Sequence, residues 1–190
     1  VYELNNKGID LAEQGRYEEA VAAFDKAIEI DPQSAKTWFN KGNILYEQGK
    51  YDEAIQAYDR AIEINPQLAE AWYNKGNALE DQGKYDEAIA AYNKVIEIDS
   101  QDMDVWNNKG NALYDQGRYS EAILAYNRAI EIDPQDAYAW NNKGNALDEL
   151  GKHDKAIAAY DKAIEIDPQY AVAWYNKGLA LSDMGKYDEA

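Results

Sequence analysis

The stretch Ala71 to Asn108 reads AWYNKGNALEDQGKYDEAIAAYNKVIEIDSQDMDVWNN, and its opening text returns 34 residues after Trp72. All five tryptophans obey this spacing: Trp38, Trp72, Trp106, Trp140 and Trp174. The twelve glycines fall into two columns of the same frame, one holding Gly8, Gly42, Gly76, Gly110, Gly144 and Gly178, and the other Gly15, Gly49, Gly83, Gly117, Gly151 and Gly185. A fixed period of this length indicates a stack of repeated units rather than one compact core.

The first half of one repeat, AKTWFNKGNILYEQG from Ala35 to Gly49, predicts a helix that ends in a turn. It contains no proline, and Trp38 and Leu45 recur at helical spacing. Gly42 in mid-helix costs about 1 kcal/mol against alanine, so its recurrence indicates a close approach by a neighbouring helix. Gly49 stands where the helix must stop, at a position that tolerates a positive φ.

The second half, KYDEAIQAYDRAIEINP from Lys50 to Pro66, predicts a second helix. Its first turn carries Asp52 and Glu53, which suit the positive end of the helix dipole. Apolar residues then follow the spacing of an amphipathic helix, and Pro66 prevents its continuation. Each repeat is therefore a pair of antiparallel helices, which must stack on its neighbours to cover its apolar face.

The recurring columns Trp38, Gly42, Ala54, Tyr58, Ala61 and Pro66 resemble the pattern of the tetratricopeptide repeat family. The resemblance implies an all-α fold, an α-solenoid of stacked antiparallel helix pairs wound into a right-handed superhelix. It also implies that the first helix of each pair lines the concave side. One array would fill residues 1–190, with repeats at 1–34, 35–68, 69–102, 103–136 and 137–170 and a partial repeat at 171–190.

Some columns depart from the family pattern. A lysine replaces the usual leucine in every copy, at Lys7, Lys41, Lys75, Lys109, Lys143 and Lys177. This column is either a basic ladder or a set of buried stems whose ammonium groups pair with nearby acids. Val95 and Ser100 replace the usual alanine and proline, so the turn after residue 98 is expected to be softer than the others.

The chain offers little to catalysis. His153, the single histidine, stands in a column of tyrosines, which favours a packing role over a general base. There is no cysteine, no phosphate-binding glycine loop and no calcium-loop pattern. We therefore expect no enzyme activity, no catalytic residue, no metal and no cofactor.

Nineteen basic against thirty-six acidic side chains give a net charge of −17. Such a surface repels phosphate backbones and anionic lipid, so nucleic acid and membrane are excluded as expected partners. No signal peptide and no apolar run of about 20 residues is present, which favours a cytoplasmic protein. The chain lacks an initiator methionine and is interpreted as a fragment of a longer protein.

One stripe of the first helices is the candidate binding surface for a protein or peptide. Side-chain amides along it could hydrogen-bond an extended peptide backbone, and aromatic rings could form pockets. The alternative is that these residues are the family's ordinary surface. The predicted peptide-binding residues are Asn40, Asn43, Asn74, Asn77, Asn108, Asn111, Asn142, Asn145, Tyr46, Tyr73, Tyr114, Tyr138, Asp81, Asp115 and Glu149.

Charge on this stripe predicts the partner's chemistry. Its single base is Lys36, against the acids Glu13, Glu47, Glu70, Glu80, Asp81, Asp104, Asp115, Asp148, Glu149 and Asp183. Some family members clamp a C-terminal carboxylate with cations and asparagines, but the matching positions here are Phe39, Asn43, Asn74, Asp104 and Asn108, without a cation. We therefore expect a basic, extended segment, the alternative being a merely solvated acidic face.

The C-terminal end supports a different hypothesis. The last complete helix carries Trp174, Tyr175, Leu179, Leu181 and Met184, more apolar than a solvating cap would be. The protein could then associate with copies of itself, end to end or by exchange of terminal helices through its incomplete last repeat. A third reading is an engineered consensus-like array, against which the irregular residues at 4, 95, 100 and 153 argue.

Overall fold

The computed structural model describes residues 1–187, which form eleven α-helices and no strand, so the predicted all-α solenoid is confirmed. Residues 188–190, the end of the predicted partial repeat, lie outside the described residues. The repeat boundaries and the superhelical winding stay predictions. The chain divides into two compact units, Val1–Asp99 and a second that begins at Ser100.

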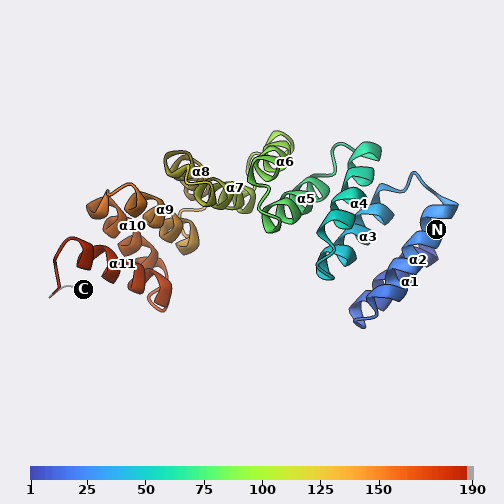
Figure 1. The fold of residues 1–190 in the computed structure, drawn as a ribbon, viewed down its shortest axis with the longest axis horizontal. Helices are drawn as coiled ribbons and strands as arrows, with labels where there is room; N and C mark the ends of the chain where they lie inside the picture. Colours follow the sequence, from blue (N-terminus) through green and yellow to red (C-terminus); the bar gives the residue numbers. More distant parts are fainter. Residues whose placement is uncertain (188–190) are drawn as a thin grey trace. The chain divides into compact units, whose positions relative to one another are not determined.

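The first unit contains three helix pairs (Figure 1), with bounds α1 Tyr2–Glu13, α2 Tyr17–Ile30, α3 Ala35–Glu47, α4 Tyr51–Ile64, α5 Ala69–Asp81 and α6 Tyr85–Ile98. Each helix packs on the next one along the chain. The first helices of successive pairs also touch, α1 against α3 and α3 against α5, so they form one continuous layer.

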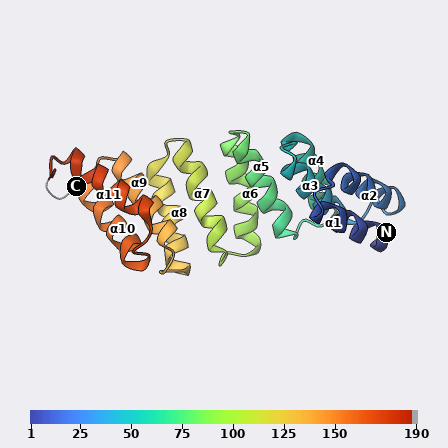
Figure 2. The same cartoon turned by 90° about the horizontal axis from the view of Figure 1, so that it is seen from below.

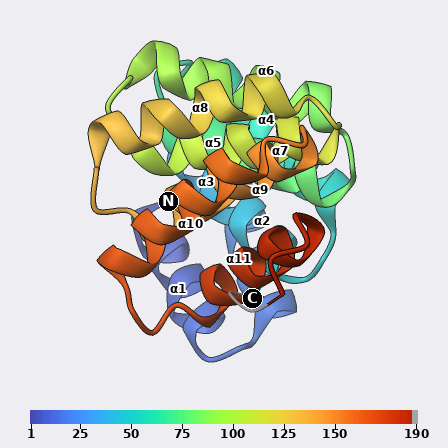
Figure 3. The same cartoon turned by 90° about the vertical axis from the view of Figure 1, so that its left-hand side faces the viewer.

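The second unit repeats this arrangement (Figure 2), with bounds α7 Met103–Asp115, α8 Tyr119–Ile132, α9 Ala137–Glu149, α10 His153–Ile166 and α11 Ala171–Asp183. Here α7 touches α9 and α9 touches α11, which again makes a layer of first helices. Figure 3 views the chain from the side of α11, which lies next to α10.

The two glycine columns have the roles that the sequence predicts. A Cβ on Gly42 would lie 2.6 Å from Cε1 of Tyr58, so only glycine lets α3 approach α4 this closely. Gly49 has a φ of 70°, and the next amide, of Lys50, donates to the carbonyl of Leu45 at 2.9 Å. This left-handed cap satisfies the last carbonyls of α3 and turns the chain toward α4.

A buried tyrosine from each later pair forms the centre of the core. Tyr58, Tyr92, Tyr126 and Tyr160 are at most 1% exposed, and Phe24 takes the same place in the first pair. The alanine columns around these rings are also buried, which allows the helices to approach one another closely. The position of each hydroxyl group matters for the surface, because a buried phenol needs a hydrogen-bond partner.

Candidate functional site

All fifteen predicted binding residues lie on α3, α5, α7 and α9, the first helices of four pairs. In each unit, we call the exposed and half-buried surface that these residues form the asparagine stripe. Tyr138 is 45% exposed, and the four predicted tyrosines and eight asparagines are otherwise only partly exposed. The structure brings these residues together in rows within each unit, but it also uses most of their amide groups internally.

In the first unit, the amide of Asn43 ties α3 to both neighbouring helices. Its Oδ1 accepts from the hydroxyl of Tyr58 at 3.0 Å and from Nδ2 of Asn74 at 2.8 Å. Both lone pairs of this oxygen are therefore occupied. Tyr92 donates in the same way to Oδ1 of Asn77 at 2.8 Å, and Asn40 donates to the buried Asn5.

The second unit repeats this network. Oδ1 of Asn111 accepts from Tyr126 at 2.9 Å and from Asn142 at 3.1 Å. Oδ1 of Asn145 accepts from Tyr160 and Asn176 in the same manner. The Oδ1 atoms of Asn43, Asn111 and Asn145 thus join neighbouring helices, and their lone pairs are not available to a peptide.

The first pair shows why asparagine stands at these positions. There Phe24, which has no hydroxyl group, replaces the buried tyrosine, and Ile9 replaces the asparagine that would accept from it. The two residues pack in one apolar cluster. This pairing was the signal in the sequence that linked the asparagine column to the buried tyrosines, and the sequence analysis did not use it.

A second set of hydrogen bonds joins successive first helices through tyrosine and an acid. The hydroxyl of Tyr46 donates to Oδ2 of Asp81 at 2.6 Å, and Tyr114 donates to Oε1 of Glu149 at 3.3 Å. Burial and the adjacent carboxylate raise the pKa of Tyr114 to about 12, and they raise the pKa of Tyr46 as well. These phenols therefore stay protonated and remain donors at neutral pH. Each one forms a hydrogen bond with one carboxylate of the stripe.

A depression of about 270 Å³ opens in the first unit between α3 and α5. Its walls are Asn43, Tyr46, Glu47, Tyr58, Asn74 and Asn77. Within residues 1–187, Nδ2 of Asn43 has no hydrogen-bond acceptor, and Glu47 has no hydrogen bond or ion pair. The depression therefore presents one spare donor and one unpaired carboxylate beside an aromatic ring.

The equivalent asparagine amide in the second unit already makes a hydrogen bond. Nδ2 of Asn111 donates to the hydroxyl of Tyr138 at 3.0 Å. The residue that corresponds to Tyr138 in the first unit is Glu70, which lies at the same register relative to Asn43. One residue of the following helix thus determines whether the amide donor remains available.

Three members of the lysine column have the second of its two predicted roles. Nζ of Lys41 lies 2.6 Å from Oδ1 of Asp25 and 5.5 Å from the ring centre of Trp38. Lys75 and Lys177 repeat this arrangement with Asp59 and Asp161. These ammonium groups stabilise contacts between helix pairs and do not form a basic ladder.

Two lysines lack the acid. Lys109 and Lys143 lie 5.0 and 4.7 Å from the ring centres of Trp106 and Trp140, and Asn93 and Asn127 stand where three other pairs carry aspartate. Neither Lys109 nor Lys143 has an ion-pair partner in the part of the chain that is described. Burial lowers the pKa of both ammonium groups.

His153 is the first residue of α10, and its imidazole hydrogen-bonds to a carboxylate, which makes an ion pair when the ring is protonated. Its Nδ1 lies 2.7 Å from Oδ1 of Asp148. The corresponding residues in the first unit are Tyr51 and Tyr46, whose ring centres are 5.5 Å apart. An aromatic contact is thus replaced by a titratable one, and the hydrogen bond with Asp148 raises the pKa of the His153 imidazole.

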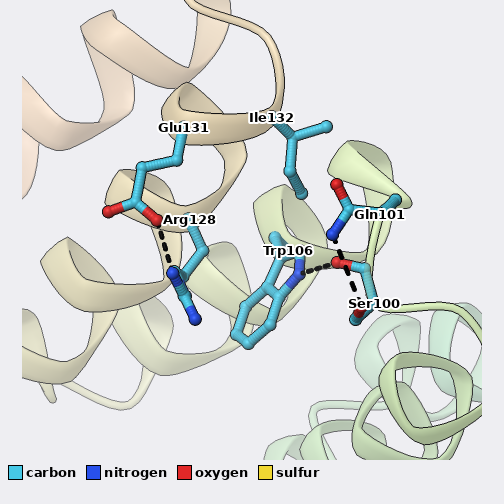
Figure 4. A pocket seen from close by; sticks show the side chains of 6 residues that line it. All are labelled: Ser100, Gln101, Trp106, Arg128, Glu131 and Ile132. Carbon is cyan, nitrogen blue, oxygen red and sulfur yellow. Dashed lines mark hydrogen bonds and ion pairs between the residues drawn. The ribbon is translucent and has the colours of Figure 1, made fainter.

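A different depression of about 270 Å³ lies in the second unit beside Trp106 (Figure 4). The indole Nε1 donates to the carbonyl of Ser100 at 3.1 Å, and Arg128 and Glu131 of α8 form an ion pair beside the ring. The same indole bond, to a proline carbonyl, recurs at the other four tryptophans. The polar groups drawn in Figure 4 bond mainly to one another, so this depression is a feature of the turn.

Other kinds of site receive no support within residues 1–187. No group of three or more histidine, aspartate or glutamate side chains there could hold a metal ion. None of the eleven helices is both long and apolar enough to cross a membrane.

Comparison with known proteins identifies the kind of fold. Family models described as "TPR repeat" match residues 8–46, 42–83 and 76–117, and models described as "Tetratricopeptide repeat" match residues 107–171 and 159–190. No curated protein matches the chain. The matches to the family models together span residues 8–190, almost the whole sequence.

Solved structures agree with the family models. The chain is 26% identical to YrrB, a TPR protein described as having an unusual peptide-binding site, with a TM-score of 0.81 over 92% of this chain and 90% of YrrB. It is 25% identical to a MamA protein, with a TM-score of 0.84 over 90% and 93% of the two chains. MamA from Desulfovibrio magneticus shares the fold alone, at 20% identity and a TM-score of 0.82 over 89% and 96%.

Proposed function

Because the chain belongs to the tetratricopeptide repeat family, we propose that it is a non-enzymatic protein-interaction scaffold whose asparagine stripe binds an extended, basic segment of a partner. TPR proteins bind other proteins or peptides, and YrrB is described by its peptide-binding site. The observation that carries the proposal is the open depression beside Asn43 and Glu47, on the layer of first helices.

The charge of the stripe supports a basic partner. Glu47, Glu70 and Asp115 have no hydrogen bond or ion pair within the described residues, whereas most lysines and arginines of the chain are paired with acids. With a net charge of −17, the protein attracts cationic segments from a distance. This attraction is screened over about 8 Å at physiological ionic strength, so binding should weaken as salt is added.

The internal hydrogen bonds limit how a peptide can be held. Since the oxygens of Asn43, Asn111 and Asn145 are occupied, these residues can offer a peptide only their remaining amide hydrogens, which donate to its carbonyls. An extended segment presents such carbonyls without regard to its sequence, and the carboxylates then select for positive side chains.

Charge reversal tests the proposal. Glu47→Lys and Asp115→Lys should each weaken the binding of a basic peptide selected on the wild-type protein by about tenfold, corresponding to about 1.4 kcal/mol. Glu29→Lys on α2 makes the same change of charge away from the stripe and should have a smaller effect. If all three variants bind the peptide as tightly as the wild-type protein does, the stripe is not the binding surface.

Self-association is the second candidate function, and it is favoured by the surface of α11. Trp174, Tyr175 and Leu179 are 51%, 67% and 47% exposed. Molar mass measured by light scattering over a range of concentrations tests this candidate. A mass that rises above 21.5 kDa supports it, and a constant mass rejects it.

A further inference from the structure

We propose that the depression beside Asn43 seats an arginine side chain of the bound segment, with the adjacent peptide carbonyl accepting from the Asn43 amide. The inference rests on the proposed function and specifies its chemistry. It depends on what the depression offers, on what is absent from its counterpart in the second unit, and on the fit of a guanidinium group.

The depression offers two kinds of contact. Nδ2 of Asn43 is a donor without an acceptor among the described residues. The Oδ1 of the same amide accepts hydrogen bonds from Tyr58 and Asn74. These two bonds also fix the orientation of the amide, so Nδ2 must point away from them. A group that satisfies this donor must be an acceptor, and a backbone carbonyl is the acceptor that every peptide carries.

The charged groups that we propose for contact with the guanidinium group are acids. Glu47 lines the depression, and no lysine or arginine does. Glu70 follows Asn43 by 27 residues, as Tyr138 follows Asn111, so its side chain starts from the same register over the amide. Its shorter side chain leaves space where Tyr138 closes the other site. Both carboxylates have no hydrogen bond or ion pair within residues 1–187, so a cation can pair with them without breaking a contact.

The ring of Tyr46 favours arginine over lysine. Its hydroxyl is held by Asp81 at 2.6 Å, and its ring packs on Tyr51, so its position is fixed before a ligand arrives. A guanidinium group can stack on such a ring and still donate to two carboxylates, because its donors lie in one plane. An ammonium group is a compact, strongly hydrated charge and gains less from the ring.

The second unit supplies the internal control. The Tyr138 hydroxyl accepts from Nδ2 of Asn111 at 3.0 Å, so one of the two amide hydrogens of Asn111 is already used and a phenol ring lies beside the amide. The arginine seat is therefore specific to the first unit.

Selection from a library of random displayed octapeptides on the whole chain tests the inference. We expect arginine to be enriched at one position, and replacement of that arginine by citrulline to weaken binding about tenfold. The double variant Glu47→Gln with Glu70→Gln should abolish the enrichment. A matched double variant, Glu29→Gln with Glu87→Gln, removes the same charge from exposed acids of α2 and α6, away from the stripe, and should retain it.

The outcomes separate this inference from the proposed function. Failure to select any peptide would reject both. Peptides that bind without an enriched arginine, or with lysine equally enriched, would reject the arginine seat and leave the binding function standing. An enrichment that survives Glu47→Gln with Glu70→Gln would place the seat elsewhere and overturn the inference.

Discussion

The first unit around Asn43 and the second unit around Asn111 have the same hydrogen-bonded frame but different rims. In both, an asparagine oxygen accepts from a buried tyrosine and from the next asparagine. In the second unit the Tyr138 hydroxyl also accepts one amide hydrogen of Asn111. In the first unit Glu70 stands at the corresponding position. The positions that form the shared frame therefore differ from the rim positions at which we propose that the partner binds.

Replacing the glycine beneath the buried tyrosine ring by alanine should destabilise both units to a similar extent. In Gly42→Ala and Gly110→Ala the new Cβ would lie 2.6 and 2.4 Å from a ring carbon of Tyr58 and Tyr126. We expect each to lower the free energy of unfolding by about 1–3 kcal/mol, measured by urea denaturation. An effect of less than about 0.5 kcal/mol in either unit would show that the frame tolerates displacement of the ring.

Exchanging the rim residues should exchange the binding properties. In Glu70→Tyr the new ring should cover the Asn43 amide, and a selected arginine peptide should bind about tenfold more weakly, because both the space and a charge are lost. In Tyr138→Glu the Asn111 amide should become available. Titration calorimetry measures both, and Glu70→Gln separates the loss of charge from the loss of space.

Removing the hydroxyl group tests the shared frame more gently. Tyr58→Phe and Tyr126→Phe should each cost about 1 kcal/mol of unfolding free energy, because an asparagine oxygen loses a donor. Addition of Asn43→Ala to Tyr58→Phe should then cost less than Asn43→Ala alone. Strictly additive effects in this double-mutant cycle would contradict the proposed coupling.

The turn between the two units should accept a proline. Ser100 replaces the proline of the other four turns, yet Trp106 donates to its carbonyl as elsewhere, and Asp99 has φ −136° and ψ 105°, values compatible with a following proline. Ser100→Pro should raise the free energy of unfolding by about 0.4–1 kcal/mol through the unfolded state. A loss of stability would show that this turn differs from its counterparts.

Only the second unit should respond to pH near neutrality through a histidine. The pKa of His153 is raised above its ordinary value of 6.5 by Asp148, so its contribution is complete below that value and is lost as pH rises through the folded pKa. The groups facing it are Asp148, Asp154 and Asp183. Thermal unfolding at several pH values should show a small loss that His153→Tyr, the residue of the other repeats, removes.

The sequence predicted the periodic features because they depend on local rules. Helix ends at Gly49 and Pro66, the close approach at Gly42 and the membership of the stripe all follow from spacing along one repeat. The roles of the amides were harder to predict. Helical register places Asn43 on a face, but it does not say that the hydroxyl of Tyr58 and the amide of Asn74 reach its oxygen.

The open and closed rims could not be derived from spacing either. Glu70 and Tyr138 occupy equivalent positions, and what separates them is side-chain length and the ability of a phenol to accept a hydrogen bond. The pairing of Lys41 with Asp25 likewise joins residues of different helix pairs, and the sequence left two interpretations of this column open. These contacts depend on the distance between neighbouring pairs, which the repeat pattern alone does not give.

The central claim is tested most directly by one thermodynamic cycle. The dissociation constants of an arginine peptide and of its citrulline counterpart are measured for the wild type and for Glu47→Gln with Glu70→Gln. We predict that the arginine peptide binds the wild type about tenfold more tightly than the citrulline peptide and that the double variant does not distinguish them. An unchanged ratio in the variant would contradict the account.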